Sequence, residues 1–71
     1  MYIRSQCGFT LGRFDVIQAE HDEQGVEILG YSGEHDYWLG HYPEERARKV
    51  IEDIQAHIVN YDRFVYNMPK E

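Results

Sequence analysis

The chain has 71 residues and a formal net charge of −6, with 13 Asp and Glu against seven Lys and Arg. This length predicts one domain, residues 1–71, and 42% apolar residues exclude a disordered chain. The negative charge disfavours direct binding to nucleic acids and to acidic membranes, and favours basic partners. No apolar run approaches the ~18 residues of a membrane span, and no signal-peptide pattern is present. Since the lone Cys7 cannot form an internal disulfide, the expected location is cytoplasmic.

The N-terminal segment predicts short strands. Ile3 alternates with Tyr2 and Arg4, which is typical of a strand with one buried face. Residues 9–11 predict a second short strand or the edge of a turn, because glycines interrupt the pattern on both sides. The strand count before Phe14 is therefore left open.

Three longer strands follow, separated by polar reversals. Alternating apolar residues predict strands at 14–21, 26–31 and 37–41. The polar segments 22–25 and 32–36 should reverse the chain, and Gly25 supplies the positive φ that a hairpin of this length needs. The pattern predicts an antiparallel meander.

The strongest periodic signal predicts an α-helix from about Pro43 to Asn60. Pro43 suits the first helical turn, where its missing N–H would have no partner. Apolar residues at steps of three and four define the face that should pack on the sheet: Ala47, Val50, Ile51, Ile54, Ile58 and Tyr61. The expected fold is therefore α+β, a small antiparallel β-meander of three to five strands with one C-terminal α-helix packed across one face. The apolar tail from Phe64 to Met68 should fold back over the core or continue onto a partner.

Three segments resemble a group of short uncharacterised proteins of low-GC Gram-positive bacteria and their phages. The segments are YIRSQ at the N-terminus, LGHYPEERARKVIEDIQ before and along the helix, and VYNMPKE at the end. The chain departs from that pattern at the helix cap, where Pro43 lies in the cap region and no Ser or Thr precedes Glu44. The group carries no assigned activity, so the resemblance implies a β-meander with a helix and a phage or mobile-element context, and it transfers no catalytic residues.

Two clusters of histidine and acid residues, at 21–23 and 34–36, offer ligand types that bind divalent metals. In the predicted meander they lie at opposite ends of the strand 26–32, roughly 20 Å apart at ~3.3 Å per residue. His21 and His41 approach the same end, but a strand lies between them and the pattern offers no third ligand. We therefore expect no metal site and no cofactor.

The sequence offers no catalytic constellation. Cys7 has no histidine at a spacing that suggests a nucleophile and its base. The acids of the helix alternate with Arg and Lys, as on a solvated face, and the glycines are scattered singly rather than in a phosphate-binding loop. We expect no enzyme activity and no catalytic residues.

Aromatic residues exceed what one small core requires, and Tyr and Trp are typical anchors of protein interfaces. The alternative is that several tyrosines merely rim the core. The candidate interaction residues are Tyr31, Tyr37, Trp38, Tyr42, Phe64 and Tyr66. An acidic patch is predicted in the central third of the chain, at Glu20, Asp22, Glu23, Glu27, Glu34 and Asp36.

The leading hypothesis is a non-enzymatic protein-interaction module of phage or mobile-element type, which binds a host protein or itself. A homodimer would form through the uncovered sheet face or the C-terminal tail. The alternative is an acidic phage-encoded inhibitor that mimics nucleic acid and occupies a host defence nuclease or another nucleic-acid-binding protein. No Lys or Arg lies between Phe14 and Arg46, which supports an acidic surface in either case.

Overall fold

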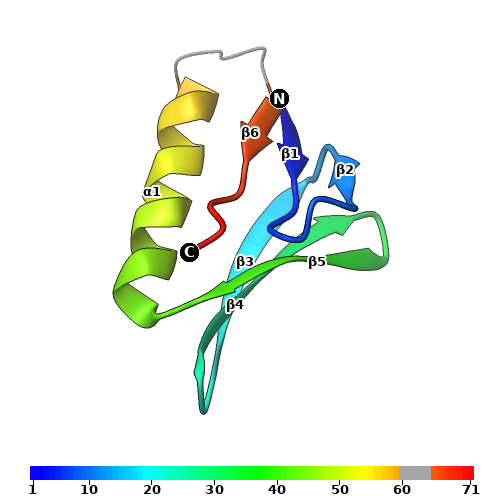
Figure 1. Cartoon of the computed structure of the whole chain (residues 1–71). Helices are drawn as coiled ribbons and strands as arrows, with labels where there is room; N and C mark the ends of the chain where they lie inside the picture. Colours follow the sequence, from blue (N-terminus) through cyan, green and yellow to red (C-terminus); the bar gives the residue numbers. More distant parts are fainter. Residues whose placement is uncertain (60–64) are drawn as a thin grey trace.

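The computed structural model describes residues 1–59 and 65–71, and its described part has two three-stranded sheets and one helix (Figure 1). The larger sheet is antiparallel and the helix packs across one of its faces. This confirms the predicted α+β class. The helix is not the last element, because the C-terminal tail adds a strand after it.

The smaller sheet joins the two ends of the chain. It consists of β1 (Tyr2–Arg4), β2 (Leu11–Gly12) and β6 (Val65–Asn67), in the order β2-β1-β6. Strand β6 runs parallel to β1, which a simple meander does not contain. Tyr66 and Met68 are buried in the core, so the described part of the tail folds back onto its own chain, the first of the two predicted outcomes. The buried residues of this part of the tail are therefore not available to bind a partner.

The larger sheet consists of β3 (Val16–Asp22), β4 (Gly25–Ser32) and β5 (His35–Tyr42), in that order. Both connections are two-residue hairpin turns, and the second contains Gly33 at φ 63°. Between β4 and β5 the register shifts after Ile28, so that Leu39 is an extra residue on β5. Because of this bulge, Leu39 points into the core and Trp38 points away from it.

Helix α1 (Glu44–Val59) begins directly after Pro43, whose carbonyl accepts the N–H of Ala47 at 2.9 Å. Its buried residues are Ala47, Val50 and Ile54. Ile58, predicted on the same face, is 58% exposed, and the predicted Tyr61 lies outside the described residues. No helix of the described residues is long and apolar enough to cross a membrane.

One core lies between the sheets and the helix. Its buried members are Ile3, Val26, Ile28, Leu39, Tyr42, Ala47, Val50, Ile54, Tyr66 and Met68. Phe14, predicted as the start of β3, instead precedes the strand and packs on Gly30. A Cβ at Gly30 would lie 2.7 Å from the Phe14 ring, so the ring occupies the space that a side chain would fill.

Candidate protein-interaction surface

Strand β4 divides its side chains between two faces of the larger sheet. Val26 and Ile28 point toward the helix and are buried, whereas Glu27, Leu29 and Tyr31 point to the opposite side, which we call the outer face. Residues directly across the ladder share that side. The outer face therefore has three rows: Glu20, Glu27 and His41; Gln18, Leu29 and Trp38; Val16, Tyr31 and Asp36.

Tyr31 lies on the outer face among carboxylates. Partial burial raises the pKa of its hydroxyl, and the negative charges of Glu20, Asp36 and Glu27 raise it further. In the adjacent row Leu29 is buried and Trp38 is 38% exposed. Trp38 and the half-buried Tyr31 therefore form an aromatic surface with acids at both ends.

The remaining aromatic candidates do not join this face. Tyr37 is exposed but lies on the helix side of the sheet, where its ring centroid is 5.8 Å from that of Phe14. Phe64 falls outside the described residues. The sequence predicts Tyr37 and Trp38 on one surface. In the structure, the alternation of side chains along β5 places them on opposite faces of the sheet.

Tyr42 and Tyr66 are core residues, which corrects their assignment to an interaction surface. Tyr42 is 1% exposed, and its hydroxyl donates to the carbonyl of Pro69 at 2.5 Å. Burial raises the pKa of Tyr42 to about 12. The Tyr66 ring packs edge-on against His57, with 4.9 Å between the ring centroids, and burial, followed by the nearby Asp53, raises its pKa. The C-terminal tail thus covers Tyr42 through Pro69 and contributes Tyr66 to the core.

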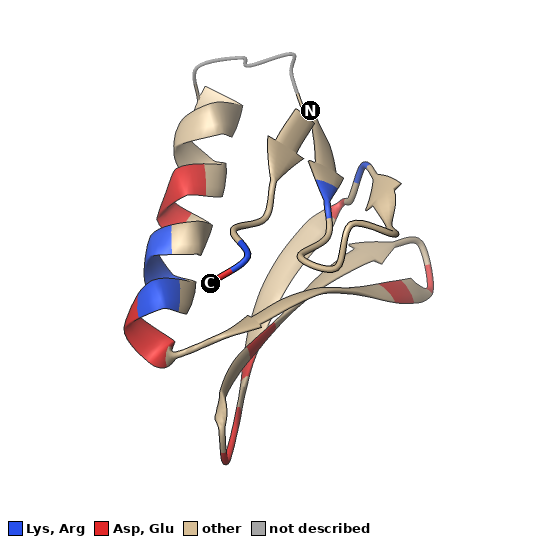
Figure 2. Ribbon diagram, viewed as in Figure 1, with Lys and Arg blue, Asp and Glu red and all other residues tan. Residues whose placement is uncertain are grey.

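The predicted acidic patch divides into three parts. Glu20, Glu27 and Asp36 lie on the outer face, Asp22 and Glu23 lie at the β3–β4 hairpin, and Glu34 lies at the β4–β5 hairpin. From β3 to β5 the charged side chains are all Asp or Glu. Arg and Lys lie on the first half of α1 and near β1 and β2 (Figure 2). The larger sheet is therefore an acidic surface, whereas α1 carries charges of both signs.

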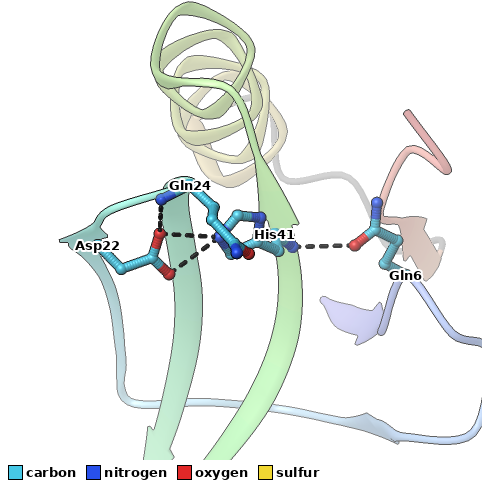
Figure 3. A network of polar contacts seen from close by, with 4 residues as sticks. All are labelled: Gln6, Asp22, Gln24 and His41. Carbon is cyan, nitrogen blue, oxygen red and sulfur yellow. Dashed lines mark hydrogen bonds and ion pairs between the residues drawn. The ribbon is translucent and has the colours of Figure 1, made fainter.

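A polar network crosses the hairpin end of the larger sheet (Figure 3). The Asp22 carboxylate accepts the backbone N–H of Gln24 at 2.8 Å and lies 2.9 Å from Nε2 of His41. The N–H of Gln24 first, and then His41, lower the pKa of Asp22. On the other side of the network, the backbone N–H of His41 donates to Oε1 of Gln6 at 2.9 Å.

Gly25 makes this network possible. It lies between Asp22 and His41 at φ 148°, and a Cβ there would be 3.1 Å from Cε1 of His41 and 2.5 Å from the carbonyl oxygen of Tyr42. Sequence reasoning found no carboxylate for His41, because the two residues sit on strands that are not neighbours. The glycine opposite Asp22 in the two-residue hairpin was the available signal.

The histidine and acid clusters do not form a metal site in the described part of the chain. The clusters at 21–23 and 34–36 lie at opposite ends of β4, as predicted. His21 instead pairs with Glu44 at the start of the helix, with 2.7 Å between Nε2 and Oε1. Across residues 1–59 and 65–71, no group of three or more metal-binding side chains converges.

Cys7 is exposed, and its sulfur lies 3.3 Å from the hydroxyl of Ser5. The hydrogen bond with Ser5 lowers the pKa of the thiol, with a smaller contribution from the backbone at Phe9. A hydroxyl is no general base, so this pair has no nucleophile–base arrangement. The outer face is the candidate site with the strongest support.

Comparisons with models of protein families, with curated proteins and with solved structures gave no match. The surface itself therefore carries the functional argument.

Proposed function

We propose that this protein is a non-enzymatic interaction module that binds a basic protein, preferably through arginine, at the outer face of its larger sheet. The observation that carries the proposal is the order of side chains on this face, where Tyr31 and the exposed Trp38 lie between Asp36 at one end and the Glu20–Glu27 pair at the other. A guanidinium can stack on an aromatic ring and donate paired hydrogen bonds to a carboxylate at the same time.

The Glu20–Glu27 pair supports a cationic partner. The two residues are directly opposite across the β3–β4 ladder, and like charges in that position destabilise a sheet. A bound cation would relieve the repulsion. His41 is opposite Glu27 on the other side, so it lies next to the place where that cation would bind.

Trp38 provides a direct test, because it is the chain's one tryptophan and its fluorescence reports on the outer face. Titration with an oligo-arginine peptide should change the emission of Trp38, and an oligo-lysine peptide of equal length should bind more weakly. Replacing both Glu20 and Glu27 with Gln should weaken binding of the arginine peptide at least about tenfold, which is about 1.4 kcal/mol.

The matched control replaces Glu23 and Glu34 with Gln, which removes the same charge at the hairpin ends. It should retain most of the affinity, because both residues lie in the hairpin turns, outside the three rows of the outer face. Equal losses in the two double variants would show that only net charge attracts the peptide, and would contradict a site on the outer face.

The second candidate function is mimicry of nucleic acid by a phage-encoded inhibitor. The observation in its favour is the distribution of acids over both hairpins as well as the outer face, with no Lys or Arg from β3 to β5. Under this alternative the double variant at Glu23 and Glu34 would lose as much binding as the one at Glu20 and Glu27. Competition by DNA or RNA for a captured nuclease would then separate mimicry from simple charge attraction. The cytoplasmic, phage-linked setting belongs to both proposals.

A further inference from the structure

In the described part of the chain, one edge of β3 has no neighbouring strand. β3 ends the order β3-β4-β5, and no strand of residues 1–59 or 65–71 pairs with its outer side. Asp22 and Gly25 flank a two-residue hairpin turn and form a hydrogen-bonded pair. The backbone groups of Asp22, and of every second residue before it, therefore bond to β4. The backbone N–H and C=O groups of Ile17, Ala19 and His21 therefore point away from the sheet.

The side chains of these same three residues border an apolar groove between β3 and α1. One hollow of about 240 Å³ is lined by Ala19, His21, Val26, Ala47 and Ile51, among others. A second hollow of about 270 Å³ is lined by Ile17, Ile51, Ile54 and Ile58, among others. Ile51 borders both hollows, so the groove follows β3 along its length.

We propose that β3 pairs with β3 of a second copy of this chain, antiparallel and with the two-fold axis at Ala19. In this register Ala19 faces Ala19, and Ile17 of each copy faces His21 of the other. Every outward N–H and C=O of the three residues then gains a partner, and the two three-stranded sheets become one continuous sheet.

The register is self-complementary in charge and size. On the outer side of the strand Gln18 lies opposite Glu20 of the other copy, and Val16 lies opposite Asp22, so no like charges are directly opposed. The smallest apolar side chain sits on the axis, which lets the strands approach. Lysine and proline, which natural proteins use to block exposed edges, are absent from β3.

The dimer would cover the groove and leave the outer face free. The two-fold axis brings the Ile17 end of one groove beside the His21 end of the other, over the joined strands, where Ile58 is 58% exposed in the single chain. The outer faces of both copies would form one acidic aromatic surface. This interface differs from the uncovered sheet face and the tail that the sequence suggested for a homodimer.

Cysteine cross-linking tests the register in a Cys7→Ser background, which removes the exposed natural thiol. Facing residues of a hydrogen-bonded pair have Cα atoms about 5.5 Å apart, which lies inside the range of a disulfide. Ala19→Cys should therefore form a covalent dimer on mild oxidation. His21→Cys should not, because its two copies would be roughly 14 Å apart, four residues along the ladder.

An equimolar mixture of Ile17→Cys and His21→Cys should cross-link as a heterodimer, since these positions face each other. Cross-linking of His21→Cys alone, or failure of Ala19→Cys, would overturn the proposed register even if the protein is a dimer.

Light scattering tests the association itself. At tens of micromolar the parent protein should have about twice the chain mass of 8.5 kDa. Ala19→Lys should shift it to the monomer mass, while Gln24→Lys, the same charge change in the β3–β4 turn, should not. A parent protein that stays monomeric at millimolar concentration would overturn the proposal and leave the edge to a strand from a different protein.

The outcome is separable from that of the proposed function. Trp38→Ala should leave the mass unchanged, and Ala19→Lys should leave the response of Trp38 to the arginine peptide unchanged per chain.

Discussion

The two edges of the larger sheet are built differently. At β5 one residue occupies two of the outward backbone groups: the N–H of Gln6 donates to the carbonyl of Leu39 at 2.7 Å, and its side-chain oxygen accepts the N–H of His41 at 2.9 Å. The side-chain NH₂ of Gln6 then donates to the carbonyl of Lys70 at 2.9 Å, which ties in the C-terminal tail. At β3 no described residue does the same.

The comparison shows that an edge can be closed without a full strand. Gln6, the second residue after β1, takes the place of a neighbouring strand at this part of β5, because the loop that follows β1 runs beside that strand (Figure 1). The β3 edge borders the groove along α1. One edge therefore contributes to folding, and the other is available for association.

The core beneath both edges should be the most sensitive region. Ile54 is 3% exposed at the centre of the helix–sheet contact, so Ile54→Asp should bury an unpaired charge and unfold the domain. Circular-dichroism melting is the measurement. Gln55→Asp, an exposed neighbour on the same helix, should leave the melting curve nearly unchanged. A folded Ile54→Asp protein would show that Ile54 is not buried between the helix and the sheet.

The next largest effect is expected at Gly25, which lies between Asp22 and His41 in the polar network of the larger sheet. Gly25→Ala should place a methyl group 2.5 Å from the carbonyl of Tyr42 and lower the free energy of unfolding by roughly 3 kcal/mol or more. Gly33→Ala separates clash from backbone strain, since Gly33 also has a positive φ but open space around it. It should cost about 1–2 kcal/mol. Equal losses in urea denaturation would contradict the close approach at Gly25.

Removal of the group that closes the β5 edge should have an intermediate effect. Gln6→Ala leaves the N–H of His41 without its acceptor and should cost about 1–3 kcal/mol, a fall in melting temperature of several degrees. Gln6→Glu keeps a carboxylate acceptor for that N–H and loses the donor to Lys70. A smaller loss for Glu than for Ala would assign the stabilisation to the closed edge, whereas equal losses would assign it to the tail.

At the open edge a proline should be tolerated. Ala19→Pro removes an N–H that points away from β4, so we expect a cost below about 1 kcal/mol, together with loss of the dimer. Gln18→Pro, one residue earlier, removes an N–H that pairs with Leu29 and should cost about 3 kcal/mol or more. Denaturation of both variants as dilute monomers compares them directly. A larger loss of stability for Ala19→Pro than for Gln18→Pro would mean that the N–H of Ala19, and not that of Gln18, bonds to β4.

The smallest effect concerns pH. Because the folded state lowers the pKa of Asp22 below its ordinary 3.8, the stabilisation is present above that value and is lost as the pH falls through the lower, folded pKa. Asp22→Asn should flatten this acid limb of a plot of melting temperature against pH. Glu23→Gln, which removes the neighbouring charge and keeps the Asp22 carboxylate, should preserve it.

Patterns among neighbouring residues of the sequence predict the local secondary structure. The alternation of Val26, Ile28 and their neighbours, the turn glycines and the three-four spacing from Ala47 to Ile54 predict the long strands, the hairpins and the helix, because these signals depend on residues close in the chain. The same reasoning separated the two histidine and acid clusters, since strand length alone sets their distance.

Contacts between segments that are distant in the chain are visible in the tertiary structure alone. The parallel pairing of β6 with β1, the position of Gln6 at the β5 edge and the contact of Asp22 with His41 join residues that no periodicity links. Burial of Tyr42 and Tyr66 likewise depends on the tail closing over the core. A tyrosine has the same pattern on a core rim as on an interface, and packing against segments far along the chain determines which of the two it occupies.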